Sequence, residues 1–179
     1  MKRLIAAAAS ALLVATPGLA SLAVGTKAPD FSTQVSLAGK PMPFNLKAAL
    51  KKGPVVLYFY PAAFTKGCTI EAHDFAEATD DFNKMGATVI GMSADDITTL
   101  NKFSVEECRN KFAVGAAAPA TIKAYDVVLP VKPDKSNRTS YVIAPDGTVI
   151  FAFSALSPVG HVTGTMDAVK AWRAKHPKA

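Results

Sequence analysis

The chain contains two cysteines, Cys68 and Cys108, and the setting of Cys68 is the more informative one. Cys68 follows an apolar, β-like run that ends at Pro61, and the residues after it have the spacing of a helix. In the first turn of a helix, unpaired N–H groups and the positive end of the helix dipole favour a thiolate over a thiol. Because the thiolate is the reactive form of cysteine, the sequence predicts that Cys68 is a nucleophile.

The segments around Cys68 alternate between strand and helix patterns. Continuous β-branched and aromatic runs predict buried strands, whereas apolar positions repeated at steps of three and four predict helices. Cys68 begins the inward face of the first of these helices. The expected elements are a strand at 55–60, a helix at 66–85, a strand at 87–92, and a helix from Asp95 or Asp96 to about residue 112.

Shorter elements are expected on both sides of this region. Turn residues separate two pairs of short strands, which predicts one hairpin near the start of the domain and another near its end. An α/β sandwich with a mixed sheet follows from this order. The expected elements are strands at 32–37, 43–46, 139–144 and 148–153, a short helix at 122–125, a polar loop at 130–137, and a C-terminal helix with Val162, Met166, Val169 and Trp172 on one face.

The first residues of the chain have the layout of a secretory signal peptide. Two basic residues precede an alanine-rich apolar stretch, which a Pro-Gly pair interrupts before the roughly 20 residues of a membrane-spanning helix are reached. We expect cleavage after Ala20 or Ala23, which gives a signal peptide at 1–23 and a single domain at 24–179. The sequence therefore predicts an exported, periplasmic protein without stable membrane association after cleavage; an uncleaved anchor is the alternative.

Among the classes of function, charge and composition argue only against nucleic-acid binding. Once the two basic residues of the signal peptide are removed, 18 basic and 14 acidic residues remain, a net charge of +4. The lysines are scattered and are not interleaved with aromatic residues, so we expect solvated faces and no nucleic-acid surface. Composition leaves open whether Cys68 and Cys108 form a structural disulfide or a redox-active pair.

The residues around Cys68 resemble the motif of the peroxiredoxin family. Pro61, Thr65 and Cys68 have the spacing Pro-x-x-x-Thr-x-x-Cys directly after a buried strand, and Arg138 precedes a strand–turn–strand segment. Residues 67–71, Gly-Cys-Thr-Ile-Glu, are similar to the bacterioferritin-comigratory or PrxQ-like branch of the AhpC/TSA superfamily. The likeness covers essentially the whole mature chain. It implies thiol peroxidase activity on a thioredoxin-like fold, a central mixed β-sheet flanked by helices with an N-terminal β-hairpin extension.

The resemblance also implies a role for each motif residue. Cys68 attacks one peroxide oxygen as a thiolate, stabilised by the helix terminus and by the always-cationic guanidinium of Arg138. Thr65 directs its hydroxyl toward the thiolate or the peroxide. The backbone N–H groups of Gly67 and Cys68 hold the oxygen on which charge develops. Pro61 lacks an N–H, so it can end the strand and shield the thiolate without adding a competing donor.

Attack leaves Cys68 as a sulfenic acid that a second thiol must resolve. Many PrxQ-like proteins carry the resolving cysteine five positions later, where this chain has His73. Other members place it on the helix after the next strand, where Cys108 falls, so an intramolecular Cys68–Cys108 disulfide is the preferred cycle. Helical spacing also fits Cys108 as an inward-facing core residue, in which case an external thiol would reset Cys68.

Further expectations concern partners and alternative functions. The resemblance implies a substrate that is hydrogen peroxide or an organic hydroperoxide, a thioredoxin-like or other thiol reductant, no cofactor, and either a monomer or a homodimer. Cysteine and histidine spacing suggests no metal site; we expect His73 at the surface and His161 to help order the start of the last helix. The alternatives are an exported thiol–disulfide oxidoreductase, although Cys-x-x-Cys is absent, and a non-catalytic redox-sensing or metal-binding module.

Overall fold

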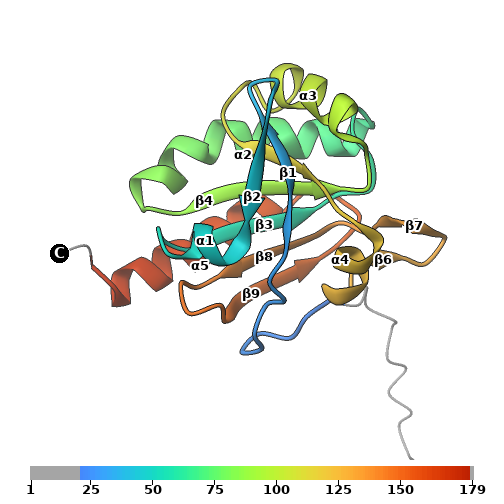
Figure 1. Cartoon of the computed structure of the whole chain (residues 1–179). Coiled ribbons are helices and arrows are strands. Elements are labelled where there is room, and N and C mark those ends of the chain that lie inside the picture. Colours follow the sequence, from blue (N-terminus) through green and yellow to red (C-terminus); the bar gives the residue numbers. More distant parts are fainter. Residues whose placement is uncertain (1–20, 178–179) are drawn as a thin grey trace, which may run out of the picture.

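A computed structural model describes residues 21–177, which form one mixed sheet with helices on both faces (Figure 1). Seven strands lie in the order β2-β1-β5-β4-β3-β8-β9, and β6 pairs with β7 in a separate ribbon. The strands are β1 Ser32–Leu37, β2 Lys40–Asn45, β3 Val55–Phe59, β4 Thr88–Ser93, β5 Ala113–Ala116, β6 Val128–Leu129, β7 Lys132–Ser136, β8 Thr139–Ile143 and β9 Val149–Ser154. The helices are α1 Leu46–Leu50, α2 Lys66–Lys84, α3 Ile97–Glu106, α4 Pro119–Ala124 and α5 His161–Lys175. The predicted α/β class, mixed sheet and N-terminal hairpin (β1 and β2) are confirmed.

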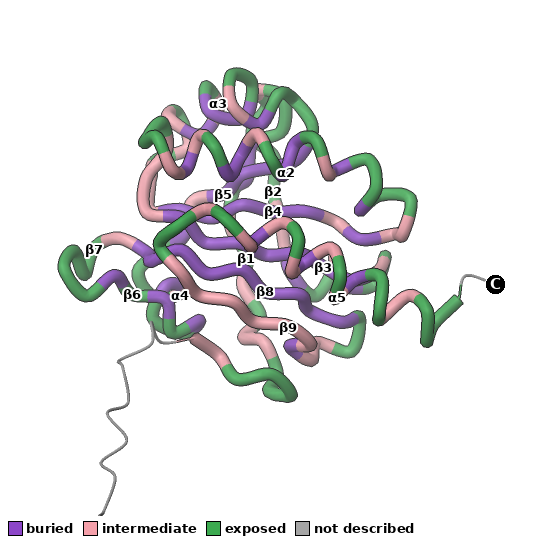
Figure 2. Tube along the Cα trace, turned by 180° about the vertical axis from the view of Figure 1, so that it is seen from behind, coloured by how far each residue is buried: buried purple, intermediate pink, exposed green. Residues whose placement is uncertain are grey.

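The central strand β3 divides the interior into two cores. Successive side chains of a strand point to opposite faces. Val56 and Tyr58 accordingly enter the core shared with α2, α3 and α5, whereas Val55 and Leu57 enter the core shared with α1 and α4. β3 runs parallel to β4 and antiparallel to β8, and Figure 2 shows these strands buried between helices with exposed outer faces. The end of β3 is therefore covered on both sides where the chain turns into α2.

The long helix α2 matches the predicted helix and its predicted inward face. It starts after Thr65, whose extended backbone (φ −80°, ψ 146°) marks the N-terminal boundary. Its inward positions pack against the sheet and α5. The predicted inward residues, all of them buried, are Cys68, Ala72, Phe75, Thr79 and Phe82.

The helix that was expected to run to about residue 112 ends earlier. α3 stops at Glu106, and Arg109 and Asn110 adopt positive φ values of 51° and 60°, which a right-handed helix cannot contain. Cys108 therefore lies in the turn after the helix. The apolar spacing misled the prediction because the turn also directs Cys108 and Phe112 inward. The chain then enters β5, a strand that the sequence did not indicate.

Two shorter segments also differ from expectation. The second strand of the hairpin ends at Asn45, whose side chain accepts a hydrogen bond from the N–H of Ala48 (2.8 Å) and so caps α1. The predicted polar loop at 130–137 contains the ribbon of β6 and β7. This ribbon pairs only with itself, so no buried hydrophobic pattern marks it in the sequence.

The predicted signal peptide lies largely outside the described residues, since positions 1–20 are not among them. Within residues 21–177, no helix combines the length and the apolar composition needed to cross a membrane.

Candidate active site

Cys68 is the third residue of α2, and its side chain is buried, with 1% of its surface exposed. The first hydrogen bond inside the helix runs from the N–H of Thr69 to the carbonyl of Thr65 (2.9 Å). The N–H groups of Lys66, Gly67 and Cys68 therefore have no partner inside the helix. These donors, together with the positive end of the helix dipole, lie at the position where the thiol sulfur is held.

Arg138, which lies 70 positions away in sequence, contacts Cys68 directly. It precedes β8, is 4% exposed, and donates from Nη2 to the Cys68 sulfur at 3.4 Å. Its Nε donates to the carbonyl of Leu156 (2.9 Å), and its Nη1 donates to Glu71 Oε2. Burial alone would lower the pKa of Arg138, but its electrostatic interactions and hydrogen bonds with Glu71 and Cys68 raise the pKa above its usual value. The guanidinium is therefore a fixed cation beside the sulfur.

Gly67 leaves room for this guanidinium. A Cβ atom added at Gly67 would lie 3.0 Å from Arg138 Nη2, closer than ordinary van der Waals contact. Any side chain at this position would therefore press on the nitrogen that contacts Cys68. The expected role of Gly67 through its backbone N–H is thus joined by a steric role that the motif did not reveal.

Glu71 and His161 belong to the same buried cluster, although no role was expected for Glu71 and only a helix-ordering role for His161. Both side chains are fully buried. His161 Nδ1 lies 3.6 Å from Glu71 Oε1 and 2.8 Å from Ser140 Oγ, and its Nε2 lies 3.0 Å from the carbonyl oxygen of Ala155. Glu71 could have been found from its position, because residues i and i+3 of a helix share a face and Cys68 is at i. Nothing in the sequence indicated that His161 would reach α2.

Burial shifts the pKa of Glu71 and the pKa of His161 in the direction that favours the neutral form of each side chain. Desolvation raises the pKa of Glu71 to about 8, and Arg138 only partly offsets this. Desolvation lowers the pKa of His161 to about 4, opposed by its hydrogen bond to the Ala155 carbonyl and reinforced by the charge of Arg138. Near neutral pH the cluster therefore favours a protonated Glu71 and a neutral His161.

Thr65 and Pro61 lie at the outer side of the site. The hydroxyl of Thr65 is exposed and donates to the carbonyl of Ala62 at 3.0 Å, so in this state it is not directed at Cys68. Pro61 is partly exposed where β3 turns toward α2. Their expected catalytic roles stay predictions.

Cys108 is a free, fully buried thiol in the same core as Cys68. Burial raises the pKa of the Cys108 thiol well above its usual value, with a further contribution from Glu107. Two ion pairs and one histidine–carboxylate hydrogen bond connect the segment 107–111 to α2, and we call these three contacts the Cys108 clasp. They are His73 Nε2–Glu107 Oε2 (2.7 Å), Arg109 Nη1–Glu77 Oε1 (3.2 Å) and Lys111 Nζ–Asp80 Oδ2 (2.8 Å).

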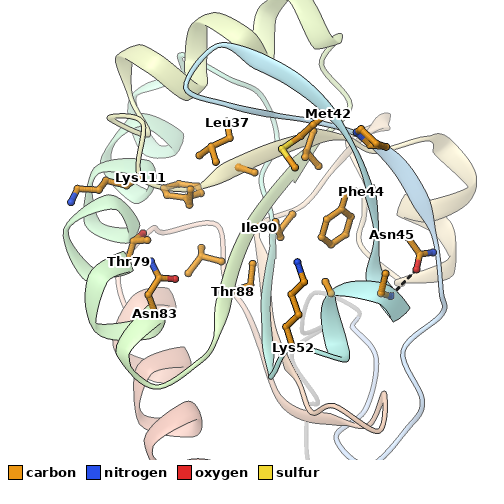
Figure 3. Close-up of a pocket in the computed structure, with 17 residues that line it drawn as sticks. Leu37, Met42, Phe44, Asn45, Lys52, Thr79, Asn83, Thr88, Ile90 and Lys111 are labelled. Carbon is orange, nitrogen blue, oxygen red and sulfur yellow. Dashed lines mark hydrogen bonds between the residues drawn. The ribbon is translucent and has the colours of Figure 1, made fainter.

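A pocket of about 420 Å³ lies elsewhere on the molecule (Figure 3). It is lined by the beginning of β4, the hairpin residues Met42 and Phe44, and Lys52, which precedes β3. Cys68 follows the opposite end of β3. The pocket is therefore separate from the thiol and does not contain the motif residues.

The comparisons with known proteins agree with the geometry. A sequence model of the AhpC/TSA family matches residues 24–152. The chain belongs to this family. Peroxiredoxin Bcp of Xanthomonas campestris pv. campestris is 29% identical to this AhpC/TSA chain over 126 residues, which is 65% of this chain and 76% of that protein. The chloroplastic peroxiredoxin Q of Gentiana triflora is 29% identical over 154 residues, 77% of this chain and 71% of that protein.

Solved structures place the AhpC/TSA chain in the same fold. Peroxidoxin BcpB from Mycobacterium tuberculosis superimposes with a TM-score of 0.72 at 30% identity, over 83% of this chain and 96% of that one. AhpC of Mycobacterium tuberculosis has a TM-score of 0.76 at 16% identity, over 89% and 98% of the two chains, and this likeness concerns the fold alone. The predicted resemblance to the Bcp and PrxQ-like branch is confirmed.

Proposed function

We propose that this chain is a thiol-dependent peroxidase that reduces hydrogen peroxide or an organic hydroperoxide with Cys68 as the nucleophile. The observation that carries the proposal is the contact from Arg138 Nη2 to the Cys68 sulfur at the start of α2. A cation and a helix N-terminus at the same sulfur favour the thiolate, the form that attacks peroxide. An inert core cysteine would need neither.

The proposed reaction transfers one oxygen to Cys68. The thiolate sulfur attacks one peroxide oxygen, the S–O bond forms as the O–O bond breaks, and the sulfur is oxidised by two electrons. The other oxygen leaves as water or an alcohol, and formation of a neutral sulfenic acid consumes one proton overall. Arg138 and the free N–H groups of Gly67 and Cys68 are the donors available to the oxygen on which negative charge develops. Thr65 and Pro61 complete the proposed pocket.

The test compares peroxide consumption by the wild type and Cys68→Ser with a thiol reductant present. We expect the substitution to abolish turnover, because a serine hydroxyl is not ionised by these neighbours. Cys108→Ser serves as the control, since it leaves Cys68 in place and should still consume one equivalent of peroxide. Comparable rates for the wild type and Cys68→Ser would overturn the proposal in favour of a binding or redox-sensing module.

We further propose that Cys108 resolves the sulfenic acid as an intramolecular disulfide, which a thioredoxin-like donor then reduces. The two thiols belong to one core, but Cys108 is buried in a turn held to α2 by the Cys108 clasp. Arg109 and Asn110 adopt left-handed backbone conformations that non-glycine residues rarely take, so the native turn is strained. Opening the turn would release this strain and would break exposed ion pairs that contribute only about 0–1 kcal/mol each. Both considerations support a small free-energy cost for opening.

Peptide mapping under non-reducing conditions after one equivalent of peroxide tests this cycle. We expect a Cys68–Cys108 linkage peptide in the wild type and, in Cys108→Ser, a trappable sulfenic acid that further peroxide oxidises irreversibly. If the wild type consumes peroxide without forming the linkage, an external thiol resets Cys68 and the two-cysteine cycle is wrong.

We also propose that the chain is exported and cleaved after Ala20. Two residues beyond that point, the backbone N–H of Leu22 donates to the hydroxyl of Tyr141 at 3.1 Å, and the Leu22 side chain packs against the core beneath α1 and α4. Cleavage after Ala23 would remove both contacts. The intact mass of the protein recovered from the periplasm distinguishes the two sites, and recovery of the uncleaved chain in membranes would contradict export of a soluble form.

A further inference from the structure

A buried carboxyl oxygen without a hydrogen-bond donor lies in the cluster around Arg138. Glu71 Oε2 accepts from Arg138, but no donor in the described part of the chain reaches Oε1. A buried oxygen without a hydrogen-bond donor destabilises the fold, and more so when it is charged, because no water replaces the missing donor. A group in this setting requires an explanation.

His161 is the nearest candidate donor for Glu71 Oε1, but its hydrogen bonds leave no hydrogen on the nitrogen that faces this oxygen. A carbonyl oxygen can only accept, so the contact to Ala155 assigns the ring hydrogen to Nε2. In the neutral ring Nδ1 then carries a lone pair, to which Ser140 Oγ donates. The Nδ1 atom, which has no hydrogen to donate, lies 3.6 Å from Glu71 Oε1. An ionised Glu71 would therefore place negative charge against a lone pair, and a proton on Oε1 removes that conflict.

Resting on the proposed peroxidase function, we propose that Glu71 carries a proton on Oε1 in the reduced protein and releases it when Cys68 is oxidised. In the reduced state the Cys68 thiolate balances the Arg138 cation and Glu71 is neutral. Oxidation to a neutral sulfenic acid removes the thiolate charge, and ionised Glu71 then becomes the counter-ion of Arg138. The buried cluster is electrically neutral before and after the reaction.

With Glu71 as the donor, this step balances without taking up a proton from solvent. A thiolate and a hydroperoxide together hold one proton fewer than a sulfenic acid and an alcohol, and Glu71 supplies that proton. The same count holds if Cys108 completes a disulfide, because the sulfenic acid and the Cys108 thiol then release one water and no net proton. The raised pKa of Glu71, about 8, is consistent with a proton held at neutral pH and available on a change of local charge.

The other charged or titratable groups around Glu71 do not offer an equivalent route. Tyr58 from β3 is fully buried with its pKa well above the usual value, so it retains its own proton. Asp74 lies on the exposed side of α2 and only adds to the raised pKa of Glu71. His161 from α5 stays neutral, because burial and the charge of Arg138 lower its pKa. Arg138 remains cationic throughout.

The first measurement is the number of protons taken up from a weakly buffered solution at pH 7, with a pH indicator, per peroxide consumed by the reduced protein. We expect the wild type to take up only a small fraction of a proton and Glu71→Gln to take up about one. Glu106→Gln, which removes an exposed carboxyl on α3, is the matched control and should behave as the wild type. Equal uptake by the wild type and Glu71→Gln, with both consuming peroxide, overturns the inference and leaves the peroxidase function intact.

The second measurement is an infrared difference spectrum of the wild type between the reduced and oxidised states. It remains informative if Glu71→Gln does not fold, and it excludes a resting state in which the proton sits on the thiol. We expect the C=O stretch of a protonated carboxyl to be present in the reduced protein and lost on oxidation. A reduced spectrum without that band overturns the inference.

Discussion

At the scale of single residues, the site depends on how two side chains and one backbone carbonyl surround a single guanidinium. Arg138 donates to Cys68 and to Glu71 through different nitrogens, and a third nitrogen is held by the carbonyl of Leu156. This three-point attachment holds the guanidinium in one orientation, which a lysine could not reproduce. This orientation requires glycine at position 67, because a Cβ atom there would lie too close to Arg138 Nη2.

Gly67→Ala should weaken peroxide reduction while preserving the fold. The added methyl group would press on Arg138 Nη2, and a shift of a few tenths of an ångström lengthens its contact to Cys68. We expect kcat/KM for peroxide to fall about tenfold, equivalent to about 1.4 kcal/mol. Stopped-flow peroxide consumption measures this, with Lys66→Ala in the same helical turn as control. An unchanged rate would show that the guanidinium tolerates displacement.

Glu71 should also produce a characteristic dependence of stability on pH. Its pKa is about 8 in the folded protein and about 4.5 when unfolded. The folded state therefore holds a proton that the unfolded chain has lost, and stability falls as pH rises from about 4.5 to 8. His161, with a pKa lowered from 6.5 to about 4, acts oppositely and costs stability as pH falls through that range.

Above pH 6.5 His161 no longer contributes, so that window separates Glu71 from His161. Urea unfolding of the reduced wild type and of Glu71→Gln between pH 6.5 and 8 should show the free energy of unfolding of the wild type decreasing by about 1 kcal/mol per pH unit relative to that of the variant. Glu71→Gln should lose this part of the slope. Parallel pH profiles for the wild type and Glu71→Gln would contradict the raised pKa.

At the scale of elements, α2 carries both the proposed nucleophile and the side chains that contact the turn containing the second thiol. His73, Glu77 and Asp80 recur on α2 at helical spacing and face the segment 107–111. His73 occupies the position where many PrxQ-like proteins have their resolving cysteine. In this chain that position instead helps to hold the turn of Cys108 in place, so the expectation of a simple surface histidine was incomplete.

Weakening the Cys108 clasp should accelerate disulfide formation without changing the first oxidation step. Lys111→Ala removes the pair with Asp80, and the turn must separate from α2 before the sulfurs meet. We expect disulfide formation about twofold faster, as for the loss of an exposed ion pair of about 0.5 kcal/mol. Acid quenching followed by mass analysis gives this rate. Lys84→Ala, which loses a pair with Asp81 inside α2, is the matched control, and equal acceleration in both variants would count against the clasp.

At the scale of the whole molecule, the start of the described chain is joined to one of the two cores beside β3. Leu22 donates to the hydroxyl of Tyr141 on β8, and that hydroxyl donates in turn to the carbonyl of Tyr125 at 2.8 Å. The segment before β1 therefore closes one edge of the core beneath α1 and α4. The position of the proposed signal cleavage should therefore also affect the stability of the domain.

A protein that starts at Val24 should be less stable than one that starts at Ser21. The shorter form lacks the Leu22 hydrogen bond and its half-buried side chain, which together contribute about 1–2 kcal/mol. Thermal unfolding of the two purified forms measures the difference. Val24→Ala in the longer form changes an exposed residue of the same segment and should have little effect. Equal stability would remove the structural argument for cleavage after Ala20.

The sequence alone predicted the central elements and the position of the candidate nucleophile at a helix start. The strand at 55–59, the inward face of α2 and the helix start before Cys68 all follow from local periodicity and from residues that end one element and begin the next. The ends of elements were harder to predict, because the inward turn at Cys108 continues a helical pattern without helical backbone.

Only the tertiary structure decided which distant groups surround the thiol. The approach of Arg138 to Cys68 was expected from a motif, but the burial of Glu71 and its distance from His161 depend on how α5 packs across α2 and β8. Periodicity reports which face of a helix is buried and carries no information about its partner from another part of the chain. Desolvation, which sets the protonation of Glu71, exists only after that packing has formed.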